Sequence, residues 1–297
     1  MKNNSFLNQY FKKRKSILRR FFIGFLVLIF CFGLIQKNQK PDDFIGKLTI
    51  DGIIHERQDL IEKLNDLEKN KKIRGLILIV NTPGGTFVSS KELYDSIKRL
   101  SKEIPTAVYM REIATSGGYL VSLSSDRIFG NSGTITGSIG VILQSTDLSE
   151  LLEKIGINPV IIKSGEFKAV PNPLEKMDQK KTDYISKIVS LMQKEFLSIL
   201  KESRNVSDDL LEIISDGRIL TGRQAKDMNL IDEIGSETDA ISWIKNQANL
   251  EDNIKIIDFT DEDNILNLFG LNFLKSKIRS FNLNSYYGLL AIWVPGL

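Results

Sequence analysis

A serine within a turn of small residues and a lysine further along the chain are the side chains best suited to chemistry. Ser116 lies in residues 114–119 (ATSGGY), and Lys168 ends residues 164–168 (SGEFK). A serine hydroxyl is a poor nucleophile and needs a base beside it. The single histidine, His55, is better explained as a surface or turn residue. Because a neutral lysine can act as the base instead, the pair predicts a hydrolase with a Ser-Lys dyad.

Lys168 can act as a base only in its neutral form. For an ordinary lysine in water, removing the proton at pH 7 costs about 4.6 kcal/mol. Burial among apolar groups can remove this cost. The neighbouring residues Phe167 and 169–171 (AVP) permit an apolar pocket around the lysine.

Three glycine-rich segments adjoin predicted strands. Residues 81–85 (NTPGG) are typical of a tight turn, but their backbone N–H groups can also stabilise an oxyanion. In residues 114–119 the N–H of Gly117 follows the serine and can face the same oxyanion, although small residues also permit close helix packing. Residues 133–140 (GTITGSIG) lack the lysine of a phosphate-binding loop, and their hydroxyls can orient a neighbouring group.

Short apolar runs alternate with amphipathic stretches along residues 44–259. The runs predict strands at residues 44–50, 75–80, 106–110, 127–129, 139–143, 159–163 and 254–259. The amphipathic stretches predict helices at residues 57–70, 86–100, 147–155, 174–204, 208–215, 221–228, 237–249 and 262–273. This alternation predicts an α/β fold with a mostly parallel sheet and surrounding helices.

The N-terminal region combines a basic segment with an apolar one. Residues 1–20 hold seven basic and no acidic residues, and residues 21–36 are predicted to form a transmembrane signal anchor. A retained anchor is favoured over a cleaved signal peptide, because residues 36–40 (QKNQK) offer no small-residue cleavage site. The positive-inside rule then leaves residues 1–20 in the cytoplasm. Residues 37–43 read as a linker to an exported domain at 44–297.

The composition excludes several classes of protein. With 42% hydrophobic and 26% charged residues the chain is globular, and the excess of basic over acidic residues is confined to residues 1–20, so nucleic-acid binding is not expected. The one cysteine, Cys31, cannot form an intramolecular disulfide, and no cysteine–histidine cluster points to a metal or cofactor. The apolar residues 286–297 are expected to be buried in their own domain or against a neighbouring subunit.

Five segments together resemble the signal peptide peptidase SppA, or protease IV-type, family of Ser-Lys serine proteases. They follow the family's order within residues 44–235 and comprise residues 81–85, 115–119, 137–141 (GSIGV), 164–168 and 216–225 (DGRILTGRQA). The resemblance implies a ClpP/crotonase-like fold, preceded here by the N-terminal transmembrane helix. The chain length is similar to that of the short form with one protease domain, which assembles as a ring-like homo-octamer.

The resemblance also implies a role for each matched residue. Ser116 is the nucleophile, Lys168 the general base, and Ser138 positions the lysine by a hydrogen bond. Gly84 or Gly85, together with Gly117, forms the oxyanion hole. In such rings the serine and the lysine can come from adjoining subunits.

The expected function is a membrane-anchored serine endopeptidase that cuts hydrophobic peptides, such as cleaved signal peptides, on the non-cytoplasmic side. Two alternatives use the same fold. One is a crotonase-like acyl-CoA enzyme, which an exported location disfavours. The other is a catalytically silent membrane scaffold, which an intact Ser116 and Lys168 disfavour.

Overall fold

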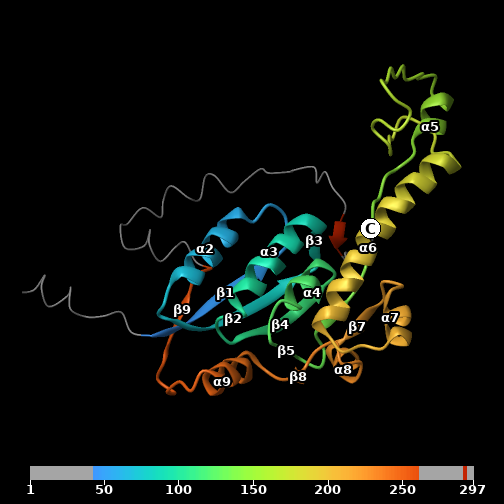
Figure 1. Ribbon diagram of the computed structural model, residues 1–297. Helices are drawn as coiled ribbons and strands as arrows, with labels where there is room; N and C mark the ends of the chain where they lie inside the picture. The colour runs from blue at the N-terminus through green and yellow to red at the C-terminus, as the bar shows by residue number, and fades with distance from the viewer. Residues whose placement is uncertain (1–42, 261–289, 293–297) are drawn as a thin grey trace, which may run out of the picture. The chain divides into compact units, whose positions relative to one another are not determined.

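The computed structural model describes residues 43–260 and a short strand at 290–292 (Figure 1). The predicted basic segment, the anchor at 21–36, Cys31, the helix at 262–273 and most of the apolar residues 286–297 lie outside the described residues. Within the described part, no helix is both long and apolar enough to cross a bilayer.

The core of the fold is an α/β layer built on a mostly parallel sheet. Its strands are β1 (Phe44–Asp51), β2 (Ile73–Thr82), β4 (Thr106–Thr115), β5 (Arg127–Gly130), β6 (Ile135–Gly137), β7 (Ile219–Thr221), β8 (Glu233–Ile234) and β9 (Lys255–Asp258). The main order is β7-β6-β4-β2-β1-β9, with β5 and β8 branching from β4. Of the strand pairs in this sheet, β6 with β7 is antiparallel and the others are parallel. The predicted fold class is thus confirmed for the described residues.

Strand β2 shows why the sequence folds into layers. Its residues 76–80 (LILIV) are all buried. The even positions, Leu76, Leu78 and Val80, belong to a core that includes side chains of α2, α3 and α4, whereas Ile77 and Ile79 pack with side chains of α9. A continuous apolar run is typical of a strand covered on both faces.

The helices lie on both faces of the sheet and beyond one end of it (Figure 1). They are α2 (Gln58–Lys69), α3 (Phe87–Leu100), α4 (Gly117–Ser122), α5 (Ser149–Lys154), α6 (Gln179–Ser203), α7 (Asp208–Ile214), α8 (Gly222–Asp227) and α9 (Glu237–Gln247). A second, two-stranded sheet joins β3 (Gly84–Thr86) to β10 (Leu290–Ile292).

Two predicted strands are wrong. Residues 139–143 do not form a strand, because Gly137 and Ser138 have positive φ angles that redirect the chain just before them, and the strand here is the earlier β6. Residues 159–163 are irregular and pair with no strand of the described chain. Their apolar side chains are exposed, with Val160 at 87% and Ile162 at 94%.

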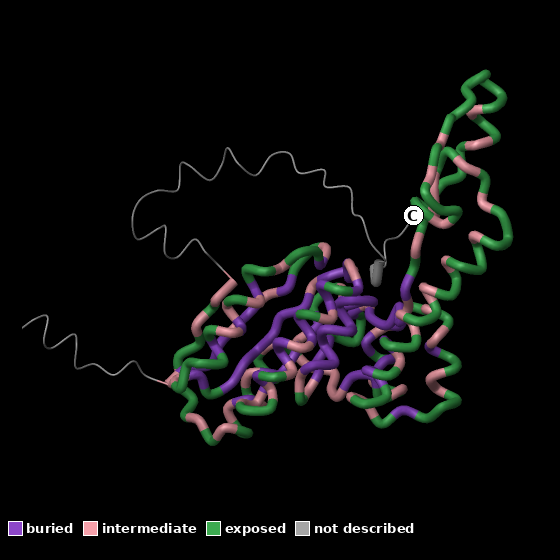
Figure 2. Tube along the Cα trace, turned by 45° about the horizontal axis from the view of Figure 1, so that its top comes forward, coloured by how far each residue is buried: buried purple, intermediate pink, exposed green. Residues whose placement is uncertain are grey.

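Residues 142–191 form a segment that we call the arm. It contains α5, the irregular chain after it and the first half of α6, which extend past the end of the sheet (Figure 1). Buried residues follow the sheet, whereas the arm is largely exposed (Figure 2). Its exposed apolar side chains include Leu151, Ile155, Ile157, Val160, Ile162 and Leu191. An apolar surface of this extent is typical of a contact with another protein.

Candidate active site

Ser116 stands at a strained junction between β4 and α4. Its backbone has φ 53° and ψ −115°, and it is the residue immediately before the first turn of α4. Such a conformation costs a non-glycine residue about 1–3 kcal/mol and is concentrated at functional sites. Close packing of α4 on β2 requires a glycine at position 118, since a Cβ on Gly118 would lie 2.6 Å from Thr82 Cγ2. The small-residue turn predicted from the sequence therefore permits close packing and places Ser116 at a strained strand-to-helix junction.

Hydrogen bonds to β6 and to Pro83 hold this junction in place. The N–H of Ser116 donates to the carbonyl of Gly137 at 2.8 Å. Thr136 Oγ1 donates to the carbonyl of Ala114 at 2.7 Å, and Thr115 Oγ1 donates to that of Pro83 at 3.1 Å. These contacts tie three glycine-rich segments together, although they are far apart in the sequence.

The side chain of Ser116 is almost completely buried, with 1% of its surface exposed. Its Oγ donates a long hydrogen bond of 3.3 Å to the carbonyl of Gly140. A bond of this length is weak. The hydroxyl is thus held only loosely against the loop of residues 137–140.

Ser138 lies in this same loop, two residues from Gly140. It is buried and has φ 50°, and its N–H donates to the carbonyl of Arg218 at 2.8 Å. Arg218 belongs to the predicted segment 216–225. The structure therefore brings the Ser138 loop beside Ser116, but within the described residues Ser138 and Lys168 form no hydrogen bond with each other.

Gln193 of α6 supports the same loop and was not singled out from the sequence. Its Nε2 donates to the carbonyls of Ile139 at 3.1 Å and Ser215 at 3.2 Å. Its Oε1 is buried and has no hydrogen-bond partner among the described residues. A glutamine in an amphipathic helix belongs to no recognisable motif, so no sequence signal pointed to it.

Gly84 and Gly85 belong to the short strand β3, which lies between two chain segments. On one side, the N–H of Ile54 donates to the carbonyl of Gly84 and the N–H of Thr86 donates to the carbonyl of Ile54, each at 2.8 Å. On the other side, Ala291 of β10 lies opposite Gly85. Since backbone groups alternate in direction along a strand, the N–H and carbonyl of Gly85 face β10.

Lys168 is exposed and lies in the arm, in the turn between α5 and α6. The neighbouring Phe167 contacts Tyr184, with ring centroids 4.7 Å apart, and Ala169 is exposed. The apolar pocket expected around the lysine is therefore not formed by its own neighbours. Figure 1 shows this part of the arm well away from α4, so the described chain does not bring Lys168 to Ser116.

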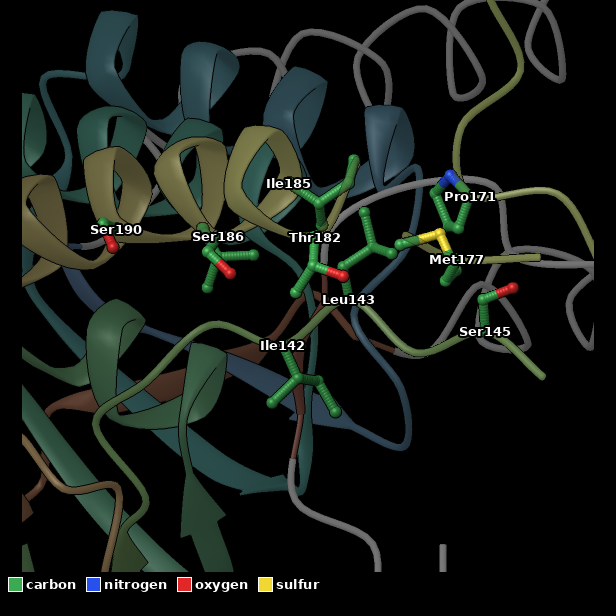
Figure 3. A pocket seen from close by; sticks show the side chains of 10 residues that line it. Ile142, Leu143, Ser145, Pro171, Met177, Thr182, Ile185, Ser186 and Ser190 are labelled. Carbon is green, nitrogen blue, oxygen red and sulfur yellow. The ribbon is translucent and has the colours of Figure 1, made fainter. Parts of the chain in front are cut away.

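An apolar pocket of about 500 Å³ lies between α6 and the chain after β6 (Figure 3). Its wall is lined by Ile142, Leu143, Pro171, Met177, Ile185 and Val189, among others. None of the predicted catalytic residues lines it. It belongs to the base of the arm and adds to the exposed apolar surface there.

A partly buried ion pair lies near Tyr119 of α4. Arg204, at the end of α6, donates to both carboxylate oxygens of Asp232 at 2.8 and 2.9 Å. Burial alone would raise the pKa of Asp232, but the hydrogen bonds and charge of Arg204 outweigh it and hold that pKa below its usual value. Nearby, Tyr119 of α4 donates to the carbonyl of Leu230 at 2.9 Å, and burial raises the pKa of its hydroxyl.

The described residues give no sign of a metal centre. No group of three histidine, cysteine, aspartate or glutamate side chains in them is placed to hold an ion. His55 is exposed, and its Nδ1 lies 3.0 Å from the carbonyl of Ile53.

Two protein-family models match this chain. The model of peptidase family S49 matches residues 98–251, and the model of Clp proteases matches residues 50–129. The first match covers the segments of Ser116, Ser138 and Lys168. The second supports a ClpP-like arrangement of the mixed α/β sheet.

Similar proteins occur in all three domains of life. A Methanocaldococcus jannaschii protein, named provisionally as a protease, is 35% identical over 72% of this chain and 68% of its own length. A Synechocystis protein, also named provisionally as a protease, is 34% identical over 70% of this chain and 75% of its own. The chloroplastic serine protease SPPA of Arabidopsis thaliana is 30% identical over 71% of this chain but only 31% of its own length.

Proposed function

The chain belongs to peptidase family S49 and is a serine protease of the signal peptide peptidase type, and we propose that it uses a Ser116–Lys168 dyad to cleave hydrophobic peptides. The observation that carries the proposal is the backbone of Ser116, which is strained at the start of α4 and bound to the loop of residues 137–140. The family assignment favours this function over an acyl-CoA enzyme or a silent scaffold.

The reaction proceeds in two halves. Ser116 Oγ forms a bond to the peptide carbonyl carbon, its proton passes to the neutral Lys168 Nζ, and the carbonyl oxygen becomes an oxyanion. The C–N bond then breaks, and the lysine ammonium gives its proton to the leaving amine. In the second half, water gives a proton to Lys168 and attacks the acyl ester. The bond from carbon to Ser116 Oγ then breaks, and the lysine ammonium returns the proton to Oγ as the acid is released.

The oxyanion needs fixed donors. The N–H of Gly117 follows the nucleophile at the first position of α4, where an N–H has no partner within the helix. The N–H of Gly85 faces the outer edge of β3. Two preorganised backbone donors of this kind are the usual means of stabilising such a charge, and Ser138 is proposed to position Lys168 by a hydrogen bond.

We further propose that Lys168 acts on Ser116 of an adjoining subunit. Within one chain, Lys168 is exposed on the arm and Ser116 is buried beside α4. The arm carries exposed apolar side chains that a neighbouring subunit can cover. Covering them would also remove Lys168 from water, which favours the neutral base. A homo-octameric ring is the proposed assembly.

The proposed location places the protease domain on the non-cytoplasmic side of a membrane. Residues 21–36 would be the signal anchor, with residues 1–20 in the cytoplasm, because seven basic residues precede the apolar segment, whereas only Lys37 and Lys40 follow it in the linker. Glycines at the reacting centre and apolar surroundings would favour small or aliphatic substrate side chains. Signal peptides already cut from their preproteins have this character.

The direct test replaces the two proposed catalytic residues separately. Ser116→Ala and Lys168→Met are each expected to reduce hydrolysis of a leucine- and alanine-rich peptide by at least about a thousandfold. Lys180→Met is the control, since Lys180 also lies beside Phe167 and is bound only to the exposed Glu166. Full activity in either purified catalytic variant would rule out the dyad.

A further inference from the structure

Glu175 holds two lysine side chains at the base of the loop that carries Lys168. Lys163 Nζ donates to Glu175 Oε2, and Lys181 Nζ lies 3.9 Å from the same oxygen. Lys163 directly precedes residues 164–174, and Glu175 directly follows them. Lys181 lies in the first turn of α6. Glu175 thus joins the two ends of this loop to each other and to α6.

This contact is shielded from water, unlike the loop that it closes. The side chains of Lys163, Glu175 and Lys181 are only 14%, 22% and 16% exposed, whereas none of residues 164–174 is buried. A segment with no buried side chains is easily opened. Removing one partner of a shielded ion pair is costly, because the remaining charge is left poorly solvated. The contact at the base is therefore a strong constraint on a loop that has no core of its own.

Two weaker contacts also hold the loop. The ring of Phe167 lies 4.7 Å from that of Tyr184, measured between centroids. The carbonyl of Pro173 accepts a hydrogen bond of 2.9 Å from the N–H of Leu148. Both contacts remain when the charge of Glu175 is removed. The loop should then loosen while the rest of the arm keeps its fold.

Helix α6 supports the loops of both proposed catalytic residues. It runs from the arm back to the end of the sheet (Figure 1). Lys181 lies near its start, and Gln193, which lies about 18 Å further along the helix at 1.5 Å per residue, donates to the carbonyl of Ile139 in the loop beside Ser116. Glu175 therefore ties the lysine loop to the helix that also supports the serine loop.

We propose that Glu175 is a positioning residue for Lys168. It holds the ends of residues 164–174 on α6, so that Lys168 Nζ is presented to the serine hydroxyl in one place. Glu175 touches neither substrate nor reacting atoms and acts only through the lysine. This role rests on the proposed Ser-Lys dyad. Its effect on the rate follows because a displacement of a catalytic group by about 1 Å can cost up to about a hundredfold.

The first experiment removes the charge of Glu175 in the full chain. Glu175→Gln keeps the size of the side chain but takes the charged partner from Lys163. We expect kcat for a leucine- and alanine-rich peptide to fall about tenfold or more, with KM and the assembly measured by light scattering unchanged. Glu150→Gln is the matched control, because its ion pair with Lys176 also lies in the arm but is exposed at both partners. Full kcat in Glu175→Gln, or a loss of activity that follows loss of the assembly, would overturn the proposal.

The second experiment tests whether Glu175 acts through Lys168. Glu175→Gln is added to a chain that already carries Lys168→Met, and the remaining hydrolysis is measured. It should not fall further, because a positioning residue has no effect once the group that it positions is gone. A further fall by the same factor as in the parent chain would mean that Glu175 supports the arm in general, which contradicts the proposal.

The third experiment follows the loop without catalysis. Hydrogen exchange of the backbone amides in residues 164–174 should be faster in Glu175→Gln and unchanged in Glu150→Gln. Unchanged exchange in Glu175→Gln would mean that the ion pair does not hold the loop.

These measurements separate the positioning role from the proposed function. Full activity of Lys168→Met would remove the dyad, although faster exchange in Glu175→Gln would still show that Glu175 holds the loop. An inactive Lys168→Met together with a fully active Glu175→Gln would keep the dyad and exclude Glu175 as its positioning residue.

Discussion

Gly85 lies so close to Ile54 that no residue with a side chain fits at position 85. A Cβ on Gly85 would be 1.7 Å from the carbonyl oxygen of Ile54, which is backbone and cannot swing aside. The two hydrogen bonds of Ile54 with Gly84 and Thr86 enforce this approach. The chain after β1 thus fixes the position of β3, the strand that carries the proposed oxyanion donor, through the edge that faces Ile54.

This contact predicts the effect of the smallest possible substitution. Gly85→Ala must push β3 away from Ile54 and misplace its N–H, so kcat/KM should fall about a hundredfold. The free energy of unfolding should fall by about 1–3 kcal/mol. Gly133→Ala is the control, because the nearest atom to its Cβ would be Asn131 Oδ1 at 3.7 Å. Peptide hydrolysis and urea denaturation measure the two effects, and a fully active Gly85→Ala would exclude β3 from the site.

A mixing experiment tests whether the dyad crosses a subunit boundary. Ser116→Ala keeps Lys168, and Lys168→Met keeps Ser116, so a mixed ring contains boundaries where both intact residues meet. With equal amounts and random assembly, about a quarter of the sites should be active. Each variant alone stays inactive. If co-assembled variants regain nothing although mixed rings form, serine and lysine must belong to the same chain.

The exposed residues of the arm should be required for assembly. Ile162→Asp places a charge where the side chain is 94% exposed, so the fold of the single chain should tolerate it while a subunit contact should not. Light scattering is expected to show loss of the oligomer, with peptide hydrolysis lost in parallel. Ile213→Asp, on α7 and 45% exposed, is the control and should keep the assembly. If the Ile162→Asp variant stays oligomeric and active, Ile162 does not belong to the subunit contact.

Gln193 should act on the site through the loop that holds Ser116. Gln193→Leu deprives the carbonyls of Ile139 and Ser215 of their shared donor and frees the loop of residues 137–140. We expect kcat to fall about tenfold or more with little change in KM, because the nucleophile is misplaced while the β3 edge is intact. Gln179→Leu, which loses only an exposed bond to Asp183, is the matched control. A change in KM alone would contradict a positioning role.

The sequence predicted those parts of the fold that are specified within a few residues of one another. The buried strand β2 and the helices α2, α3 and α9 follow from local periodicity, and the turn at Ser116 follows from its small residues. The strand predicted at 139–143 failed because positive φ angles at Gly137 and Ser138 cannot be read from apolar patterning. Residues 159–163 have a strand pattern without a partner strand in the described chain.

The site itself was only partly accessible to sequence reasoning. Hydrogen bonds join the segment of Ser116 to Pro83 and to the loop of residues 137–140, and the peptidase family was identified correctly. The surroundings of Lys168 could not be predicted, because a pocket that its own neighbours do not form depends on other parts of the protein. No sequence motif marked Gln193 or the pair of Arg204 with Asp232, because their contacts join residues that are brought together only when the chain is folded.

The ion pair of Arg204 with Asp232 predicts how stability depends on pH. The folded-state pKa of Asp232 is lowered. The stability that Asp232 contributes is therefore fully present at pH values above its unfolded-state pKa, near 4, and is lost as pH falls through its folded-state pKa. Asp232→Asn leaves Arg204 largely buried without its charged partner and should cost about 3 kcal/mol at pH 7. Because the lost carboxylate is the titrating group, the stability of Asp232→Asn and of the parent chain should converge as pH falls below about 4. Asp66→Asn, which disrupts an exposed pair with Lys69, should leave the curve unchanged. Denaturation curves at several pH values measure these differences, and a constant gap between Asp232→Asn and the parent chain down to pH 2 would mean that the pair does not control acid stability.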